Sequence, residues 1–386
     1  MIKLHKACYL LLLSLLCCRK PYNPPAFASA GSYLVVEGVI NSGSDSTTIK
    51  LSQTVNVSSA NTANPVLHAV LTVLSDQNVS YPLTETTNGN YVSAGLNLDN
   101  TRTYRLSIKT PDNKQYQSDF APVTITPSID SIGFNIVNTP VAGIQIYANT
   151  HDATNTIKYY RWDYDEAWAF NSKYGSDYVS NGNAIVPRTY GQNISNCYAN
   201  DVSSNIVLGS TTKLSQDVIY QTPIVFIAST SEKIESEYSI LLREYALTAD
   251  AYNFWVSLKT NTEQLGSIFD AQPSQLQSNI HCITNPSEPV IGYISVCAVS
   301  SKRVFIPSAK LPNWVTDYPY MCAVDSVLYC APPFCNNDVY RLLVPGILIP
   351  IAPIGNQLNP LGFLASTIEC VDCTIRGSKT PPAFWP

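Results

Sequence analysis

Short runs of β-branched and aromatic residues, separated by turn-forming residues, dominate the sequence from Ser32 to about Val123. The runs SYLVVEGVI and TTIKLSQTVNV flank NSGSDS, and later runs are separated by Asn-Gly and Pro-Asp-Asn. In TYRLSIKT, Tyr104, Leu106 and Ile108 alternate with polar residues, which predicts a strand with one buried face. Strands of this length, with turns at intervals of about 8 to 12 residues, are typical of an immunoglobulin-like or transthyretin-like β-sandwich.

The remainder of the chain predicts a second, larger β-rich domain. Pro122 and Pro127 mark a linker, and the runs that follow, such as YYRWDYDEAWAF and YSILLREYAL, again favour strands. We therefore predict a mainly β protein with a β-sandwich over residues 32–126. The β-rich C-terminal domain, over residues 127–386, is expected to hold one main helix and disulfides.

The segment LTADAYNFWVSLKTNTEQL is the one stretch that favours a helix of useful length. Thr248 is a suitable N-cap, and Asp250 falls in the first turn, where an acidic side chain is favourable. The aromatic and leucine side chains recur at helical spacing, so we expect Tyr252, Trp255 and Leu258 to be core anchors rather than ligand contacts.

The N-terminal residues have the pattern of a bacterial lipoprotein signal. Basic residues precede a short apolar run that ends at Cys17 and Cys18, and the run is too short to span a membrane. We predict a signal peptide over residues 1–17, acylation of Cys18, and a lipid-anchored tether over residues 18–31. Cys17 is the alternative anchor, and an ordinary secreted protein with a stray thiol is the alternative to lipidation.

Charge and composition exclude one class of partner. The formal net charge is −5, charged residues make up 13% of the chain, and no basic run or stripe is present. We therefore expect no nucleic-acid partner. A surface with few charges must expose mainly Ser, Thr, Asn, Gln and Tyr, as many exported β-proteins do.

Eight of the 11 cysteines remain after Cys8, Cys17 and Cys18 are set aside. An even number in an exported protein favours structural disulfides over a zinc site or a redox pair, although CVDC and CAPPFC have spacings that could ligate a metal. We predict no metal and no cofactor, and leave the connectivity open. The candidates are Cys197, Cys282, Cys297, Cys322, Cys330, Cys335, Cys370 and Cys373.

The sequence contains no His-Glu-x-x-His, Gly-x-Ser-x-Gly or P-loop motif, and its one Ser-x-x-Lys match, Ser210 to Lys213, lacks the companion motifs of penicillin-binding enzymes. Its most distinctive polar stretch is YYRWDYDEAWAFNSKYGSDY, in which carboxylates lie among aromatic residues. In a strand, two carboxylates on one face could bind Ca²⁺ or act as acid and base, whereas a solvated strand face above an aromatic core is the simpler interpretation. The candidate binding residues are Trp162, Asp163, Asp165, Glu166 and Trp168.

Several blocks resemble one family in order along the chain. KPYNPP after the cysteine, SYLVVEGVINSG, the long block from LLREYAL to NPSEPVIGYISV, and the terminal CVDCTIRGSKTPPAFW are similar to a group of Bacteroidetes outer-membrane lipoproteins of unknown function. The resemblance implies an N-terminal carboxypeptidase-regulatory or transthyretin-like module and genes beside those of TonB-dependent receptors. It implies no catalytic residues, and only the acylated Cys18 transfers. Surface-exported members often carry acidic residues after the anchor, where this chain has Arg19 and Lys20, so the face of the outer membrane stays open.

We therefore expect a non-enzymatic lipoprotein of the outer membrane. Its expected partners are a TonB-dependent receptor barrel and a nutrient ligand that the sequence does not identify. A freestanding envelope adhesin or structural lipoprotein is one alternative. A surface hydrolase that uses Asp163 and Asp165 is the other.

Overall fold

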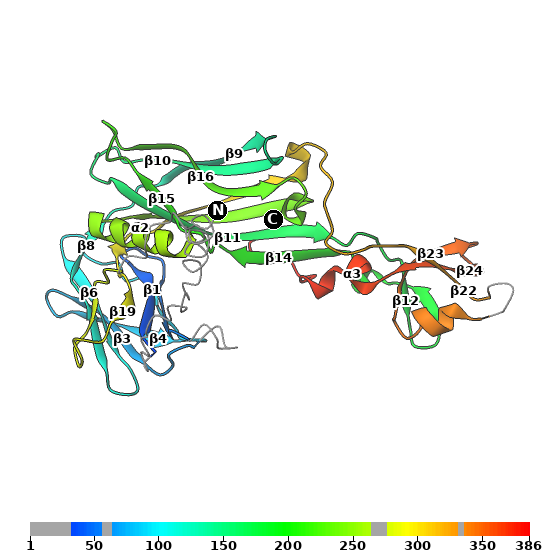
Figure 1. The fold of residues 1–386 in the computed structure, drawn as a ribbon, viewed down its shortest axis with the longest axis horizontal. Coiled ribbons are helices and arrows are strands. Elements are labelled where there is room, and N and C mark those ends of the chain that lie inside the picture. The colour runs from blue at the N-terminus through cyan, green and yellow to red at the C-terminus, as the bar shows by residue number, and fades with distance from the viewer. Residues whose placement is uncertain (1–31, 56–63, 264–275, 331–335) are drawn as a thin grey trace, which may run out of the picture.

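The computed structural model describes residues 32–55, 64–263, 276–330 and 336–386, and it is mainly β. Figure 1 shows an elongated molecule with a β-sandwich at one end, two packed sheets in the middle and a small sheet at the far end. One main helix, α2 (Ala249–Glu263), lies between the sandwich and the middle sheets. The predicted fold class is confirmed. The predicted signal peptide, the predicted tether and the predicted acylation of Cys18 fall within residues 1–31, which lie outside the described part.

The first unit, called the sandwich below, combines eight N-terminal strands with three strands from much later in the chain. Its core alternates as predicted: Tyr104, Leu106 and Ile108 of β6 are all buried. The strands are β1 (Leu34–Asn41), β2 (Thr47–Gln53), β3 (Val70–Ser75), β4 (Ser80–Glu85), β5 (Asn90–Ser93), β6 (Thr103–Lys109), β7 (Gln115–Ser118), β8 (Ala121–Thr124), β18 (Ile280–Cys282), β19 (Val290–Gly292) and β20 (Val296–Cys297).

Strand pairing closes the sandwich into a circuit. The strand order runs β18-β7-β6-β3-β4-β5-β2-β1-β20-β8, and an additional pairing of β8 with β6 closes a circuit that runs from β6 to β8. Strands β7 and β18 continue from β6 outside this circuit, and β19 pairs with β1. Strand β20 makes the closure possible, because it lies parallel between β1 and β8. Closure reduces the number of exposed strand edges, which would otherwise invite aggregation. Strand pairing thus crosses the boundary that the sequence placed at residue 126.

A glycine permits the close approach of β19 to β1. Gly292 has a φ of +141°, a conformation that residues with a Cβ rarely adopt. A Cβ at this position would lie 2.2 Å from the carbonyl oxygen of Val36. A side chain larger than hydrogen would therefore push the two parallel strands apart.

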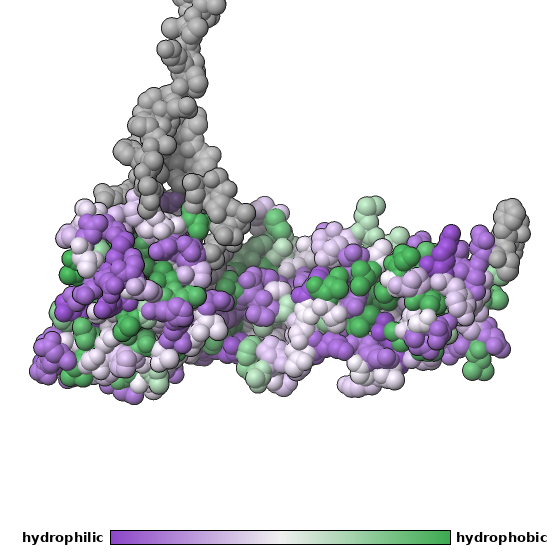
Figure 2. Space-filling model, turned by 90° about the horizontal axis from the view of Figure 1, so that it is seen from below, coloured by the Kyte–Doolittle hydropathy of each residue, from purple (hydrophilic) through white to green (hydrophobic). Residues whose placement is uncertain are grey.

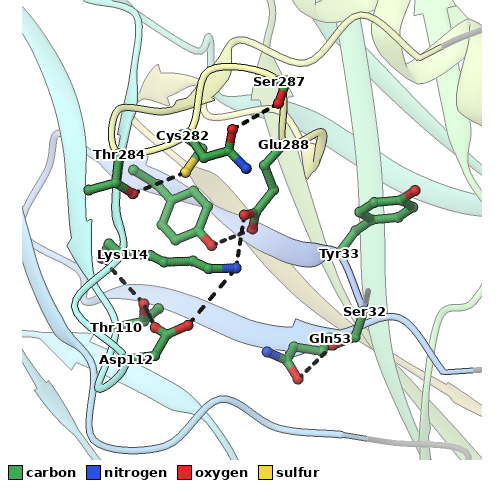
Figure 3. Close-up of polar contacts among 12 residues, drawn as sticks. Ser32, Tyr33, Gln53, Thr110, Asp112, Lys114, Cys282, Thr284, Ser287 and Glu288 are labelled. Atoms are coloured by element: carbon green, nitrogen blue, oxygen red, sulfur yellow. Dashed lines mark hydrogen bonds and ion pairs between the residues drawn. The ribbon is translucent and has the colours of Figure 1, made fainter. Parts of the chain in front are cut away.

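The late segment is fastened to the sandwich by a polar cluster (Figure 3). The carboxylate of Glu288, in the NPSEP sequence after β18, accepts hydrogen bonds from Lys114 Nζ at 2.8 Å and from the Tyr116 hydroxyl at 2.7 Å. Burial alone would raise the pKa of Glu288, but the bonds from Lys114 and Tyr116 outweigh it, and the pKa is lowered. Glu288 therefore links two segments that are more than 170 positions apart.

The middle of the molecule, called the central sheets below, consists of two sheets packed face to face. Ile144 and Ile146 of one sheet and Trp162 and Ile240 of the other belong to a single buried cluster. One sheet has the order β16 (Val218–Ala228), β10 (Gly143–His151), β9 (Ile129–Val137), and the other has β14 (Asn196–Val202), β11 (Tyr159–Asn171), β17 (Glu237–Ala246), β21 (Ser300–Pro307), with β15 (Val207–Ser210) also on β11.

Helix α2 begins as the sequence predicts. The Thr248 hydroxyl accepts a hydrogen bond from the backbone N–H of Ala251 at 3.3 Å, which is the action of an N-cap. Its fully buried residues are Ala251 and Phe254, whereas Trp255 is partly exposed. The buried face is thus displaced by about one residue from the predicted one, because the helix packs against both the sandwich and the central sheets.

The far end, called the arm below, is a small apolar unit. Its core is formed by Val327, Val339, Leu343, Phe363 and Ala365. Large apolar side chains also reach its surface, and Figure 2 shows hydrophobic patches at this end. Its elements are β12 (Tyr178–Ser180), β13 (Ile185–Pro187), β22 (Asp325–Leu328), β23 (Ile349–Gly355), β24 (Pro360–Ser366), a π-helical turn (Val339–Leu343) and α3 (Ile368–Val371).

Short 3-10 turns complete the fold. One of them, Glu232–Ile234, begins at Ser231, whose side chain accepts a hydrogen bond from the Lys233 N–H. The others are Tyr190–Gln192, Ser308–Lys310 and Cys373–Ile375. Among the residues that the structure describes, no helix combines the length and the apolar character needed to cross a membrane.

One disulfide links the C-terminal segment to the central sheets, and a second lies within the arm. Cys197 of β14 is bonded to Cys373, and Cys322 is bonded to Cys370. Cys330 is also disulfide-bonded, and the remaining candidate, Cys335, lies outside the described residues.

Two of the eight predicted disulfide cysteines are not in disulfides, so the prediction was wrong for them. Cys282 and Cys297 are free thiols, and both are buried. Cys282 packs in the core of the sandwich, whereas Cys297 packs in a separate cluster with Tyr245 and Ala251. The two thiols belong to different clusters and do not pair with each other. Each therefore fills a buried position as a small apolar side chain.

Candidate functional site

Strand β11 divides its side chains between the two faces of its sheet, as the alternation predicts. Trp162, Tyr164 and Glu166 are buried between the central sheets, while Asp163 and Asp165 lie on the opposite, partly exposed face. The five predicted binding residues therefore do not form one site. Two of them reach an open face, and three are enclosed by protein.

The buried face of β11 has a structural role. The Trp162 ring is 1% exposed, and its Nε1 donates a hydrogen bond to Glu244 Oε2 at 2.7 Å. The Thr150 hydroxyl donates to the other oxygen of Glu244 at 2.9 Å. Burial raises the pKa of Glu244 to about 7, despite these two hydrogen bonds. Glu244 is therefore a buried carboxyl between two sheets, with a hydrogen bond to each of its oxygens, and its role is structural.

Glu166 and Trp168 belong to a second enclosed network. Glu166 is 5% exposed, accepts a hydrogen bond from the Tyr238 hydroxyl at 2.8 Å and is ion-paired with Lys233. The Lys233 Nζ also lies 4.9 Å from the centre of the Trp168 ring, and Trp168 Nε1 donates to Glu232 at 3.3 Å. These contacts fasten the turn at Glu232–Ile234 to β11 and engage both oxygens of Glu166. Glu166 also borders a smaller hollow of about 390 Å³ beside Asp165.

The open face carries a chain of alternating charges. Arg243, on β17, donates to Asp165 through both terminal nitrogens at 2.7 Å and to Asp163 through Nε at 2.6 Å. Arg161 is ion-paired with the second oxygen of Asp163. Hydrogen bonding to Asp165 is the main cause that raises the pKa of Arg243 above its ordinary value. All four side chains are held by each other in fixed positions.

This charged face forms one wall of a cavity of about 740 Å³ between the sandwich and the central sheets. The central sheets contribute Arg161, Asp163, Arg243 and Tyr245. The sandwich contributes residues of β1 and β2, and α2 contributes Phe254, Trp255 and Leu258. Other lining residues include Leu241, Ile291, Tyr293, Val299 and Ser301. The size and the mixture of apolar, aromatic and a few polar groups are those of a small-molecule site.

Arg161 is the most constrained polar group of the cavity. The carbon at the centre of its guanidinium lies 4.2 Å from the centre of the Trp255 ring and 4.5 Å from that of Tyr245. Its side chain is 13% exposed. Aromatic rings within about 6 Å of a guanidinium attract it, so these two rings fix its plane.

Sequence reasoning missed most of this cavity. It identified Asp163 and placed it correctly on the same face as Asp165, but Arg161, Arg243, Tyr245 and Trp255 were not proposed. One signal was present: Arg161 stands two positions before Asp163, so strand alternation places both on one face. No such signal exists for Arg243, because its position depends on the pairing of β17 with β11.

The carboxylates of the open face do not form a metal centre. Their oxygens are hydrogen-bonded to arginine, and within the described ranges no group of three or more His, Cys, Asp or Glu side chains is arranged to hold a metal ion. The Ca²⁺ interpretation of Asp163 and Asp165 has no geometric support here.

The fold and this cavity define a mainly β protein whose two large units enclose a candidate ligand site. The chain belongs to the family described as Domain of unknown function (DUF4249), whose model matches residues 19–303. Every residue that lines the cavity, from Val35 to Ser301, lies within the matched range. A search of curated proteins found no match.

Proposed function

We propose that this protein is a non-enzymatic binding lipoprotein that holds a small ligand in the cavity between the sandwich and the central sheets. The observation that carries the proposal is the cavity itself, where Arg161, Asp163 and Trp255 converge. Pockets of this kind, largely apolar with a few fixed polar groups, are the usual sites of small ligands. The protein would act as an accessory or ligand-binding subunit beside a TonB-dependent receptor in nutrient uptake.

The N-terminal sequence supports anchoring in the outer membrane. Acylation of Cys18 would place lipid 14 positions before Ser32, where the described sandwich begins. A chain of this length reaches at most about 50 Å when extended, so the sandwich would stay close to the membrane surface. Each acyl methylene contributes about 0.8 kcal/mol, so an anchor with several chains is stable.

The ion pairs favour binding over acid–base catalysis. Asp163 and Asp165, the carboxylates of the hydrolase hypothesis, both accept hydrogen bonds from Arg243. A proton transfer to or from either one would require an ion pair to break first. This arrangement suits a rigid recognition surface better than a general acid or base.

The surface of the arm favours a second candidate function, that of an adhesin or structural envelope protein. Met321 is 97% exposed, Leu358 is 89% exposed and Leu361 is 67% exposed. Exposed apolar side chains grouped on one unit are typical of surfaces that contact other molecules. Such a role would not need the cavity.

The anchor and the partner are tested together. The tagged protein is extracted from native outer membranes with a mild detergent, and mass spectrometry examines its N-terminal peptide and all co-purifying proteins. We expect an acylated Cys18 and a stoichiometric TonB-dependent barrel. An acylated protein without a barrel would favour the adhesin function, and an unmodified N-terminus would remove the anchor from the proposal.

The ligand is tested by comparing two variants of one helix. Leu258→Trp adds bulk inside the cavity, whereas Val256→Trp adds it at a position that is 39% exposed and outside the lining. Small molecules released by denaturing each purified protein are compared by mass spectrometry. A compound present in the wild type and in Val256→Trp but absent from Leu258→Trp supports the cavity. Equal retention by both variants contradicts it.

A further inference from the structure

We infer that the cavity selects ligands that carry a carboxylate on an apolar body, with Arg161 as the group that recognises the acid. This inference rests on the proposed binding function and names its ligand class. It follows from the bonding of Arg161, from the charges of the surrounding wall and from the apolar remainder of the lining.

Arg161 has hydrogen-bonding capacity that its described neighbours do not use. A guanidinium has five N–H donors, and the described side-chain contacts engage one nitrogen of Arg161, which is paired with Asp163. None of the nitrogens of Arg161 is among the buried polar atoms that lack a partner in the described part. The unused donors therefore reach open space, and the cavity is the space that Arg161 lines.

The carboxylates of the inner wall are shared unequally between its two arginines. Arg243 has two carboxylate partners, Asp163 and Asp165, and Asp165 lies in a neighbouring hollow with Arg303. Arg161, at the end of this chain of charges, has among the described carboxylates only Asp163, which it shares with Arg243. An acidic ligand group would give Arg161 a carboxylate partner of its own.

The other charges of the lining lie at its solvent-exposed rim. Lys50 and Glu37 are more than half exposed and pair with each other at 3.4 Å, and Asp45 is also exposed. Charges in contact with water are strongly screened, so they affect the inner wall weakly. Arg161, whose one described carboxylate partner is shared with Arg243, therefore determines the preference for a charged group.

The geometry of Arg161 suits a carboxylate more than a hydroxyl. The rings of Tyr245 and Trp255 lie 4.5 Å and 4.2 Å from the guanidinium carbon, so a ligand in the cavity meets the N–H groups that these rings and Asp163 leave accessible. The edge of a guanidinium donates two parallel hydrogen bonds, which match the two oxygens of a carboxylate. Val39, Leu241, Leu258 and Ile291 line the remaining space and would contact an apolar body.

The test compares two probes that differ only in the acid: dansyl-labelled undecanoic acid and its methyl ester. Both are titrated by fluorescence into the full mature protein near pH 7.5. We expect the acid to bind at least about tenfold more tightly than the ester, because only the acid presents a charged carboxylate to the guanidinium of Arg161. This comparison uses the wild-type protein and depends on no variant.

Variants then assign the preference to Arg161. Arg161→Gln is expected to reduce the affinity for the acid to that for the ester and to leave the ester within about twofold of wild type, while Arg161→Lys keeps part of the preference. Arg102→Gln, on a turn of the sandwich outside the cavity, serves as the control with no expected change.

The failures are distinguishable. If acid and ester bind equally and Leu258→Trp removes both, the cavity binds ligands but the carboxylate inference is wrong. If Arg161→Gln keeps the tenfold preference, another group recognises the acid and the role of Arg161 is wrong. If neither probe binds, but a native compound is retained by wild type and Val256→Trp and lost from Leu258→Trp, the carboxylate inference is wrong and the proposed function stands. If that comparison also shows no difference, the inference fails together with the proposed function.

Discussion

The sandwich and the C-terminal region, meaning the central sheets with the arm, are stabilised in different ways. The sandwich closes its strand circuit around an apolar core and contains buried free Cys282. The C-terminal region contains the disulfides Cys197–Cys373 and Cys322–Cys370. It also contains the three carboxylates that are buried among the described residues: Glu166, Asp217 and Glu244.

The contrast shows why covalent links occur where they do. A small unit buries a small fraction of its surface and gains little from its core alone, so disulfides compensate. The described core of the arm has five fully buried apolar residues, and Cys322–Cys370 lies at its base. The sandwich needs no such link because its strands pair around the whole circuit.

The largest expected effect is the loss of Cys197–Cys373. Replacing both residues by alanine opens a link between positions 176 apart, for which the loop-entropy model gives about 5 kcal/mol as an upper value. Hydrogen exchange measured by region should show faster exchange in β14 and around Cys373, with the sandwich unchanged. Equal loosening of the sandwich would break the comparison, because the two regions would then unfold as one.

The next effect concerns Glu244 and pH. Burial raises the pKa of this carboxyl to about 7 in the folded protein, from 4.5 when it is exposed. The raised pKa therefore makes a contribution to the free energy of unfolding that is fully present below about pH 4.5. This contribution, about 3 kcal/mol, is lost as the pH rises through 7.

Glu244→Gln should remove this part of the pH dependence. Thermal or denaturant unfolding of wild type and variant at pH 5 and pH 8 gives the difference directly. Glu37→Gln, which changes a carboxyl that is 58% exposed, is the control and should leave the dependence intact. An unchanged pH dependence in Glu244→Gln would mean that another group titrates.

A moderate effect is expected at the cluster that fastens the late strands to the sandwich. Glu288→Ala removes the acceptor of both Lys114 and Tyr116, and should destabilise the sandwich by about 2 kcal/mol. Glu37→Ala breaks the exposed pair with Lys50 and should cost less than about 0.5 kcal/mol. Equal effects of the two changes would show that the cluster does not hold the late segment.

The smallest effect concerns the free thiols. Cys297 is fully buried, and burial raises the pKa of its thiol to about 12, so it has almost no reactive thiolate near neutral pH. Peptide mapping after alkylation should show Cys297 and Cys282 labelled only when the protein is unfolded. Cys297→Ala should cost only about 1 kcal/mol, as for a small buried apolar group. Rapid labelling of the native protein would contradict the burial.

Local sequence patterns correctly predicted features that depend only on residues close together in the chain, such as the faces of strands and the start of a helix. Alternation placed Tyr104, Leu106 and Ile108 in a core and put Asp163 with Asp165 on one face, and capping rules located the start of α2 at Thr248. These features need no knowledge of distant parts of the chain.

Features that depend on long-range pairing could not be predicted. Arg243 meets Asp163 because β17 pairs with β11 in one register, and Cys297 is unpaired because β20 inserts between β1 and β8. The parity of the cysteine count indicated oxidation but could not say which thiols approach each other. The cavity likewise exists only once the sandwich, α2 and the central sheets are assembled.

The late arrival of β20 has a consequence for synthesis. A hydrogen bond joins Val299 to Asn41, 258 positions earlier, in the same region where β20 pairs with β1. A chain that emerges with its N-terminus first exposes its first strands before β20 is available to pair with them. Until β20 arrives, β1 and β8 have unpaired edges. The protein therefore completes its N-terminal unit after most of its middle has been made, and any chain that stops at α2 would leave that unit open.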